Sequence, residues 1–220
     1  MTPRWLARVH GSHRYGVLFY TLLFTLAAAP LLTALRFHAD ILQIFLAFNL
    51  LIALLGPGRR WQTLLILVAA VSIGLRIVPA SDVGVGITWS ALALASSLAL
   101  LAAVSAARFA VRAQVINAEQ IYAALSVYLL AGLFFGLLHW EIELTWPGSF
   151  GEAGASLPAP FALSTAIYFS FVTLATLGYG DVVPKTEVAR GVAVLEAVGG
   201  QLYVAVTIAR LVGAQLQARG

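Results

Sequence analysis

The sequence has no cysteine and few charged residues. The absence of cysteine excludes disulfide bonds, thiolate metal sites and cysteine nucleophiles. Charged residues make up 10% of the 220 residues, whereas hydrophobic residues make up 61%. A soluble domain of this length cannot bury so much apolar surface. The composition therefore predicts an integral membrane protein.

The chain also lacks the side-chain groupings of an enzyme or a metal centre. No nucleophile, base and orienting group stand at a spacing that suggests a catalytic site. The histidines fall at different levels of the expected helices and suggest no ligand cluster: His10, His13, His38 and His139. We interpret His139 as interfacial, with pH sensing as the alternative. We expect no enzymatic activity, no organic cofactor and, without a separate basic domain, no nucleic-acid partner.

Long apolar stretches dominate what is present. Most approach the ~20 residues that a helix needs to cross a bilayer, and they fall at residues 16–35, 41–55, 61–79, 84–107, 120–139 and 188–212. A further apolar piece at 161–174 is too short to cross and suits a re-entrant helix buried in protein. The sequence therefore predicts an all-α membrane protein with six transmembrane helices and one re-entrant helix.

Residues 173–181, directly after the short apolar piece, read TLATLGYGD. A cation that has lost its water needs closely spaced oxygens, and four successive backbone carbonyls here could supply them: those of Thr176, Leu177, Gly178 and Tyr179. Gly178 and Gly180 allow backbone dihedrals that a side chain forbids, so that the carbonyls turn to one side while Tyr179 packs behind the strand. The segment is therefore a candidate ion filter, with a chance glycine-rich turn as the alternative.

This pattern resembles the selectivity filter of tetrameric potassium channels. Thr173, Thr176, Asp181 and Pro184 stand where that family has them, whereas Leu177 replaces the family's valine. The resemblance implies potassium ions bound by the carbonyls of residues 176–179, with Thr173, Gly180 and Asp181 as support. Tyr168, where relatives often have tryptophan, is the expected hydrogen-bond partner of Asp181. One filter loop per chain implies a homotetramer.

We divide the chain into three parts: residues 1–107, a four-helix transmembrane domain; residues 108–118, an interfacial linker; and residues 119–220, the pore domain. The first part resembles a voltage sensor without gating charges, because residues 83–107 contain no charged side chain. We therefore predict no intrinsic voltage sensing; a sensor that uses Arg76 is the weaker alternative. In the linker, Arg108, Arg112 and Glu119 are expected along one helical face.

The last apolar stretch carries the expected cavity and gate. By resemblance, Gly200 is a hinge, although close packing against the short helix explains it equally well. Gln201 is expected to face the cavity, followed at helical spacing by Val204 and Ile208, an apolar lining that could gate by dewetting. Lipid contact is the alternative. Glu196 points about 140° from Gln201, which favours a structural hydrogen bond behind the filter over a role in the lumen.

Basic residues predict the orientation. Nine of the 13 lysines and arginines fall on the side of the N-terminus, which predicts cytoplasmic termini in a multi-pass protein of the inner (plasma) membrane. We expect no attached nucleotide- or calcium-binding domain. The predicted function is passive, potassium-selective conduction in contact with membrane lipid. A non-selective cation channel, a transporter subunit and a non-conducting modulatory subunit stay open as alternatives.

Overall fold

The computed structural model describes residues 14–34, 49, 85–112, 117–152 and 161–217. Its elements, in order, are α2 (Arg14–Ala34), α5 (Val85–Arg112), α6 (Ala118–Thr145), β1 (Phe150–Gly151), α7 (Leu163–Leu174), β2 (Val183–Pro184) and α8 (Glu187–Gln217). The mostly helical fold agrees with the helical part of the predicted class, and each described helix falls close to an apolar stretch of the sequence. The spans predicted at 41–55 and 61–79 lie outside the described residues.

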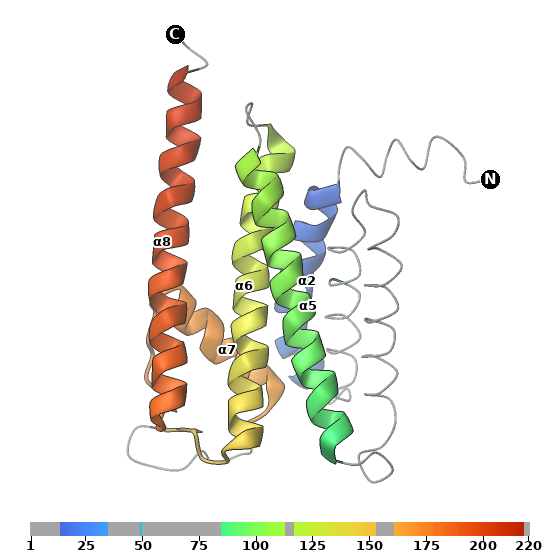
Figure 1. The fold of residues 1–220 in the computed structure, drawn as a ribbon, viewed down its shortest axis with the longest axis vertical. Helices are drawn as coiled ribbons and strands as arrows, with labels where there is room; N and C mark the ends of the chain where they lie inside the picture. The colour runs from blue at the N-terminus through green and yellow to red at the C-terminus, as the bar shows by residue number, and fades with distance from the viewer. Residues whose placement is uncertain (1–13, 35–48, 50–84, 113–116, 153–160, 218–220) are drawn as a thin grey trace, which may run out of the picture.

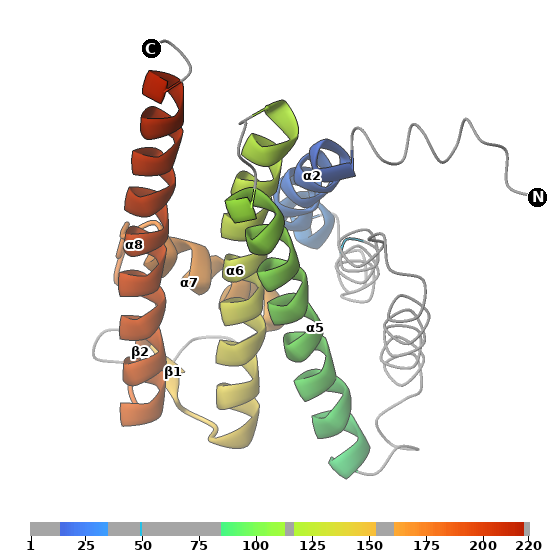
Figure 2. The ribbon, with the colours of Figure 1, turned by 45° about the horizontal axis from the view of Figure 1, so that its top comes forward.

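Among the described residues, two helices, α6 and α8, are long and apolar enough to cross a membrane. The apolar helical stretches Arg14–Ala28, Ser96–Ala110 and Leu163–Leu174 are shorter. Figures 1 and 2 show α6 at the centre of the described part, with α2 and α5 on one side and α8 on the other. Helix α7 lies between α6 and α8 and contacts both. Helix α6 is thus the element against which the others pack.

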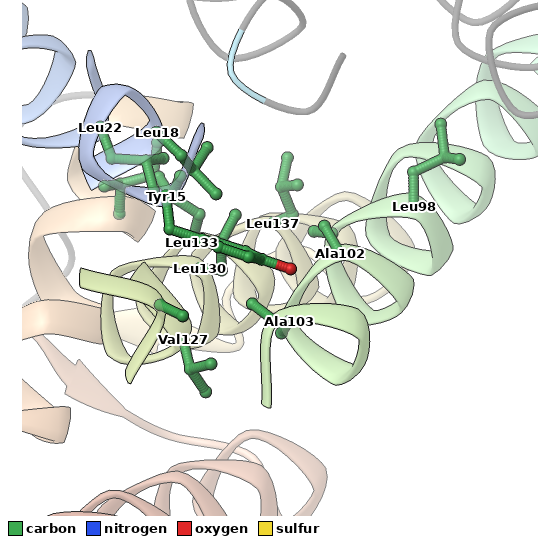
Figure 3. Packing of buried hydrophobic residues seen from close by; sticks show 14 of the residues in the cluster. Tyr15, Leu18, Leu22, Leu98, Ala102, Ala103, Val127, Leu130, Leu133 and Leu137 are labelled. Carbon is green, nitrogen blue, oxygen red and sulfur yellow. The ribbon is translucent and has the colours of Figure 1, made fainter. Parts of the chain in front are cut away.

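The main apolar core joins α2 and α5 to α6 (Figure 3). Leu18 and Leu22 of α2 and Leu130 of α6 are fully buried in it. Helix α5 contributes mainly alanines, including Ala99 and Ala102. Small side chains let two helix backbones approach closely. Membrane helices commonly associate through such residues, because in lipid the hydrophobic effect does not drive helices together. The alanine face therefore lets α5 pack closely against α6.

Helix α6 begins at a well-formed cap. The Asn117 side chain accepts hydrogen bonds from the backbone N–H groups of Glu119 and Gln120, and the Gln120 side chain accepts one from the Asn117 N–H. This reciprocal arrangement satisfies N–H groups that a helix start leaves without partners. Asn117 itself has extended backbone, with φ −114° and ψ 179°.

The cap corrects one prediction. Arg108 and Arg112 belong to α5, whereas Glu119 lies in α6 beyond the extended Asn117, so the three do not share one helical face. Glu119 instead accepts a hydrogen bond of 3.0 Å from the Tyr15 N–H in the first turn of α2. A carboxylate there stabilises the free N–H groups and the positive end of that helix.

Two short strands, which the sequence did not predict, close the loop around α7. Phe150 pairs with Pro184 and Gly151 with Val183 in an antiparallel bridge. The Glu143 carboxylate supports the approach to β1 by accepting hydrogen bonds from the N–H groups of Gly148 (2.8 Å) and Phe150 (3.0 Å). The chain therefore leaves for α7 and returns before α8 at the same end of α6 (Figure 1).

Candidate functional site

The site begins where α7 ends. The Leu177 N–H donates to the Val172 carbonyl at 2.8 Å, and the Thr176 N–H donates to the Thr173 carbonyl at 3.0 Å. These two bonds are the Schellman arrangement that ends many helices, with the residue at the turning point in the left-handed region. That residue is Thr176, with φ +57°. Glycine usually fills this position, because a β-branched side chain is strained there.

The next residues continue an alternating backbone. Gly178 has φ +57° and Gly180 has φ +78°, whereas Leu177 and Tyr179 do not have positive φ. A chain that alternates between the left-handed and right-handed regions places successive N–H groups on one side and successive carbonyls on the other. In residues 176–180, which we call the candidate filter, positive φ therefore recurs at every second residue.

The two filter glycines are needed for their dihedral angles and not for space. A Cβ built on Gly178 or Gly180 meets no atom within 4 Å in this chain. A methyl group at either position would therefore collide with no atom of this chain. An alanine at either position is instead strained by its positive φ.

The outer end of the candidate filter is tied to α7. The Tyr168 hydroxyl donates to Asp181 Oδ2 at 2.8 Å, so the hydrogen bond expected from the sequence is present. Asp181 Oδ1 also accepts from the Val182 N–H at 3.0 Å. The predicted packing of Tyr179 behind the strand is absent within one chain, where this side chain is 66% exposed and Leu177 is 56% exposed.

The inner end of the candidate filter lies close to α8. A Cβ on Gly200 would come within 2.6 Å of Leu174 Cδ1 and 3.1 Å of the Leu174 carbonyl oxygen. Of the two explanations left open for this glycine, close packing against α7 therefore applies, and α8 runs through the position as one helix. The Gln201 amide lies 3.4 Å from the same carbonyl, at the base of α7.

Below this point α8 has two different faces. The Tyr203 hydroxyl donates to the Ala124 carbonyl of α6 at 2.6 Å. Ile208, five residues on, is 55% exposed, and Val204 is partly exposed. Ile208 thus lies on a side of α8 away from the α6 contact, whereas Gln201 contacts the end of α7 and Val204 is half-buried. Whether that side lines a cavity stays a prediction.

Glu196 is fully buried between three helices. Its Oε2 lies 2.7 Å from His139 Nε2 of α6, and its Oε1 is hydrogen-bonded to the Ser170 hydroxyl of α7. The expected structural hydrogen bond of Glu196 is therefore present. The interfacial interpretation of His139 is wrong, because this ring has 0% exposure and lies against the Phe150 and Phe169 rings.

His139 is the residue that sequence reasoning missed. His139 and Glu196 are 57 residues apart and lie on different helices, so helical spacing could not predict their contact. The available signal was chemical: each of the two long apolar helices carries an ionisable side chain in its interior, and such groups usually pair with each other.

Comparison with known families finds a match in the C-terminal part of the chain. Residues 123–215 match the family described as "Ion channel". The matched segment covers less than half of the chain and runs from α6 through α7 and the candidate filter to α8, so this part of the chain is similar to ion channels. Together with the two membrane-capable helices, the match supports a membrane protein. No curated protein and no solved structure matches the chain.

Proposed function

We propose that this part of the chain is an ion-channel domain that conducts potassium ions passively and selectively, through carbonyl oxygens of Thr176, Leu177, Gly178 and Tyr179. The observation that carries the proposal is the alternation of φ at Thr176, Gly178 and Gly180. This pattern is costly for threonine and unnecessary for an ordinary loop, but it is what a row of carbonyls requires. Asp181, Tyr168 and Thr173 support the row from outside through the contacts described above.

The proposed assembly is a homotetramer in lipid. A single loop supplies oxygens on one side of an ion only, so several copies must surround it. The exposure of Leu177 and Tyr179 within one chain agrees with packing partners on a neighbouring copy. Large apolar side chains of α8 are exposed as well, which suits contact with lipid or with other subunits: Val194, Leu195, Val198, Leu202 and Val206.

The proposed topology keeps both termini cytoplasmic, with residues 1–107 as a four-helix domain, residues 108–118 as a linker and residues 119–220 as the pore domain. In this arrangement the candidate filter opens outward and α7 is a re-entrant helix in the membrane. Gln201, Val204 and Ile208 line the cavity and the inner mouth. The first domain does not sense voltage, because α5 carries no charge before Arg108.

A pair of glycine substitutions tests the filter assignment. Gly178 and Gly148 both have positive φ, +57° and +86°, and a Cβ on either meets nothing within 4 Å. Gly178→Ala and Gly148→Ala therefore impose comparable backbone strain, but only the first lies in the candidate filter. We expect Gly178→Ala to abolish rubidium uptake into proteoliposomes and Gly148→Ala to retain it. Unchanged rubidium uptake by the Gly178→Ala protein would contradict the filter assignment.

A further inference from the structure

A buried polar cluster lies behind the candidate filter. Glu196, His139 and Ser170 each have 0% exposure, and they come from α8, α6 and α7 respectively. The cluster is closed on the side of β1 by aromatic rings: His139 meets Phe169 at 4.9 Å and Phe150 at 5.3 Å between ring centroids, both edge to face. Burial of three polar side chains is costly unless they satisfy one another.

The contacts of this cluster indicate its protonation state, because each hydrogen bond needs one hydrogen atom. The Ser170 hydroxyl contacts the Gly132 carbonyl at 2.7 Å as well as Glu196 Oε1. A serine hydroxyl has one hydrogen, and a carbonyl can only accept. If Ser170 donates to Gly132, the contact with Glu196 needs a hydrogen from the carboxyl group. Both contacts are satisfied at once when Glu196 is a neutral acid that donates to Ser170.

His139 fits the same assignment. Its Nε2 lies 2.7 Å from Glu196 Oε2, whereas its buried Nδ1 has no hydrogen-bond partner among the described residues. A neutral ring with its hydrogen on Nε2 donates to the carboxyl and leaves only a lone pair without a partner. A charged ring would bury an N–H without an acceptor, which costs more. The neutral cluster therefore contains one donor for each contact and buries no charge.

Helix α7 packs closely against α6. A Cβ on Gly132 of α6 would come within 2.5 Å of the Phe171 ring, and one on Gly136 would come within 2.9 Å of the Ile167 backbone. With so little space, the Ser170 hydroxyl is fixed in one direction relative to α6 and α8. Ser170 precedes the start of the candidate filter at Thr176 by less than two helical turns, so a rotation of α7 would shift that segment.

We propose that Glu196, in its neutral form, is a positioning residue for the filter: it hydrogen-bonds α7 through Ser170 and α6 through His139, and this fixes the carbonyl row in its selective arrangement. The inference rests on the proposed potassium conduction and names what maintains it. It differs from a plain packing role because it requires a hydrogen donor and an acceptor at position 196, and not only a side chain of the right volume.

Two substitutions at the same position separate these roles. Glu196→Gln keeps a donor for Ser170 and an acceptor for His139 without a charge, whereas Glu196→Leu keeps volume alone. In proteoliposomes under potassium–sodium gradients, we expect Glu196→Gln to retain the wild-type permeability ratio. We expect Glu196→Leu to lower it by about tenfold, the scale of one hydrogen bond. Glu187→Leu, at an exposed carboxylate, is the matched control.

His139→Phe supplies an independent arm, because it removes the donor to Glu196 and retains a ring. His139→Phe should lower the permeability ratio, as Glu196→Leu does. The double variant should lower it no further than the single variants, as expected for residues that act through one contact. If Glu196→Leu does not assemble, His139→Phe and Ser170→Ala carry the test, with thermal stability of the purified protein as the check on folding.

The outcomes are distinct. A wild-type protein without potassium selectivity overturns the proposed function itself. A selective wild type, together with folded Glu196→Leu and His139→Phe proteins of unchanged selectivity, overturns the positioning role alone. Equal impairment of Glu196→Gln and Glu196→Leu overturns it as well, because the site would then require a carboxylate that only glutamate provides.

Discussion

Thr176 combines strain with a useful hydroxyl at the point where α7 ends. Its φ of +57° is unusual for any side chain other than glycine, and for a β-branched one it costs about 1–3 kcal/mol. The surrounding hydrogen bonds of Val172 and Thr173 hold the residue in place in spite of that cost. A strained residue at such a position gives a reason to test whether its side chain has a function.

Replacement of Thr176 tests this account. Thr176→Gly should relieve the strain, so the protein should be at least as stable to heat as the wild type. It should nevertheless conduct potassium less selectively, because the hydroxyl at the inner end of the row is lost. Thr176→Ser keeps the hydroxyl and is the control, with selectivity close to wild type. Thermal unfolding and reversal potentials measure the two effects, and an equally selective Thr176→Gly protein would exclude a role for the hydroxyl.

At this scale the sequence predicted contacts between neighbours in the motif better than contacts across the fold. The Tyr168–Asp181 bond, between residues 13 positions apart, was expected from the resemblance to potassium channels. The partner of Glu196 was not, because helical periodicity gives the direction of a side chain but not the helix that it meets. His139 was therefore assigned to an interface although it is fully buried.

Helix α8 separates two roles between its faces. Tyr203 and Glu196 turn toward α6 and α7, where they make hydrogen bonds. Ile208 turns away from that contact and is 55% exposed in the single chain. In a tetramer, a face that avoids its own subunit is available to line the inner mouth. An apolar side chain there can hold the mouth dry and closed.

Two exposed positions on α8 distinguish a gate from a lipid contact. Ile208 and Val206 are exposed to a similar extent, 55% and 58%, but point about 200° apart at 100° per residue. Ile208→Asn should wet the constriction and raise the resting potassium conductance, whereas Val206→Asn should not. Single-channel recording measures the open probability. If both variants behave alike, the gate lies elsewhere, most simply in the filter segment.

Element by element, the apolar stretches predicted the described helices, because length and hydrophobicity are local properties. The observed helix ends differ from the predicted ones where a specific contact determines them. Asn117 starts α6 with a cap and so breaks the expected continuity from Arg108 to Glu119. The β1–β2 bridge was missed because two-residue strands have no periodicity to detect, and their pairing depends on the loop that α7 occupies.

For the whole molecule, the absence of charge from α5 before Arg108 has a direct consequence. One elementary charge crossing the field is worth about 2.3 kcal/mol per 100 mV, so a helix that moves no charge gains almost no voltage bias. Its alanine face also packs directly onto α6 (Figure 3). We expect the open probability to change little between about −100 and about +100 mV, a range that includes resting potentials of roughly −40 to −90 mV. A steep sigmoidal conductance curve without blocking ions would contradict this.

Potassium selectivity of the purified protein alone tests the central claim most directly. With potassium on one side of a planar bilayer and sodium on the other, a row of backbone carbonyls at residues 176–179 should give a reversal potential set by potassium. A reversal potential near zero would contradict the claim and indicate a non-selective pore. No current, from correctly assembled protein, would instead indicate a subunit that only modulates a partner channel.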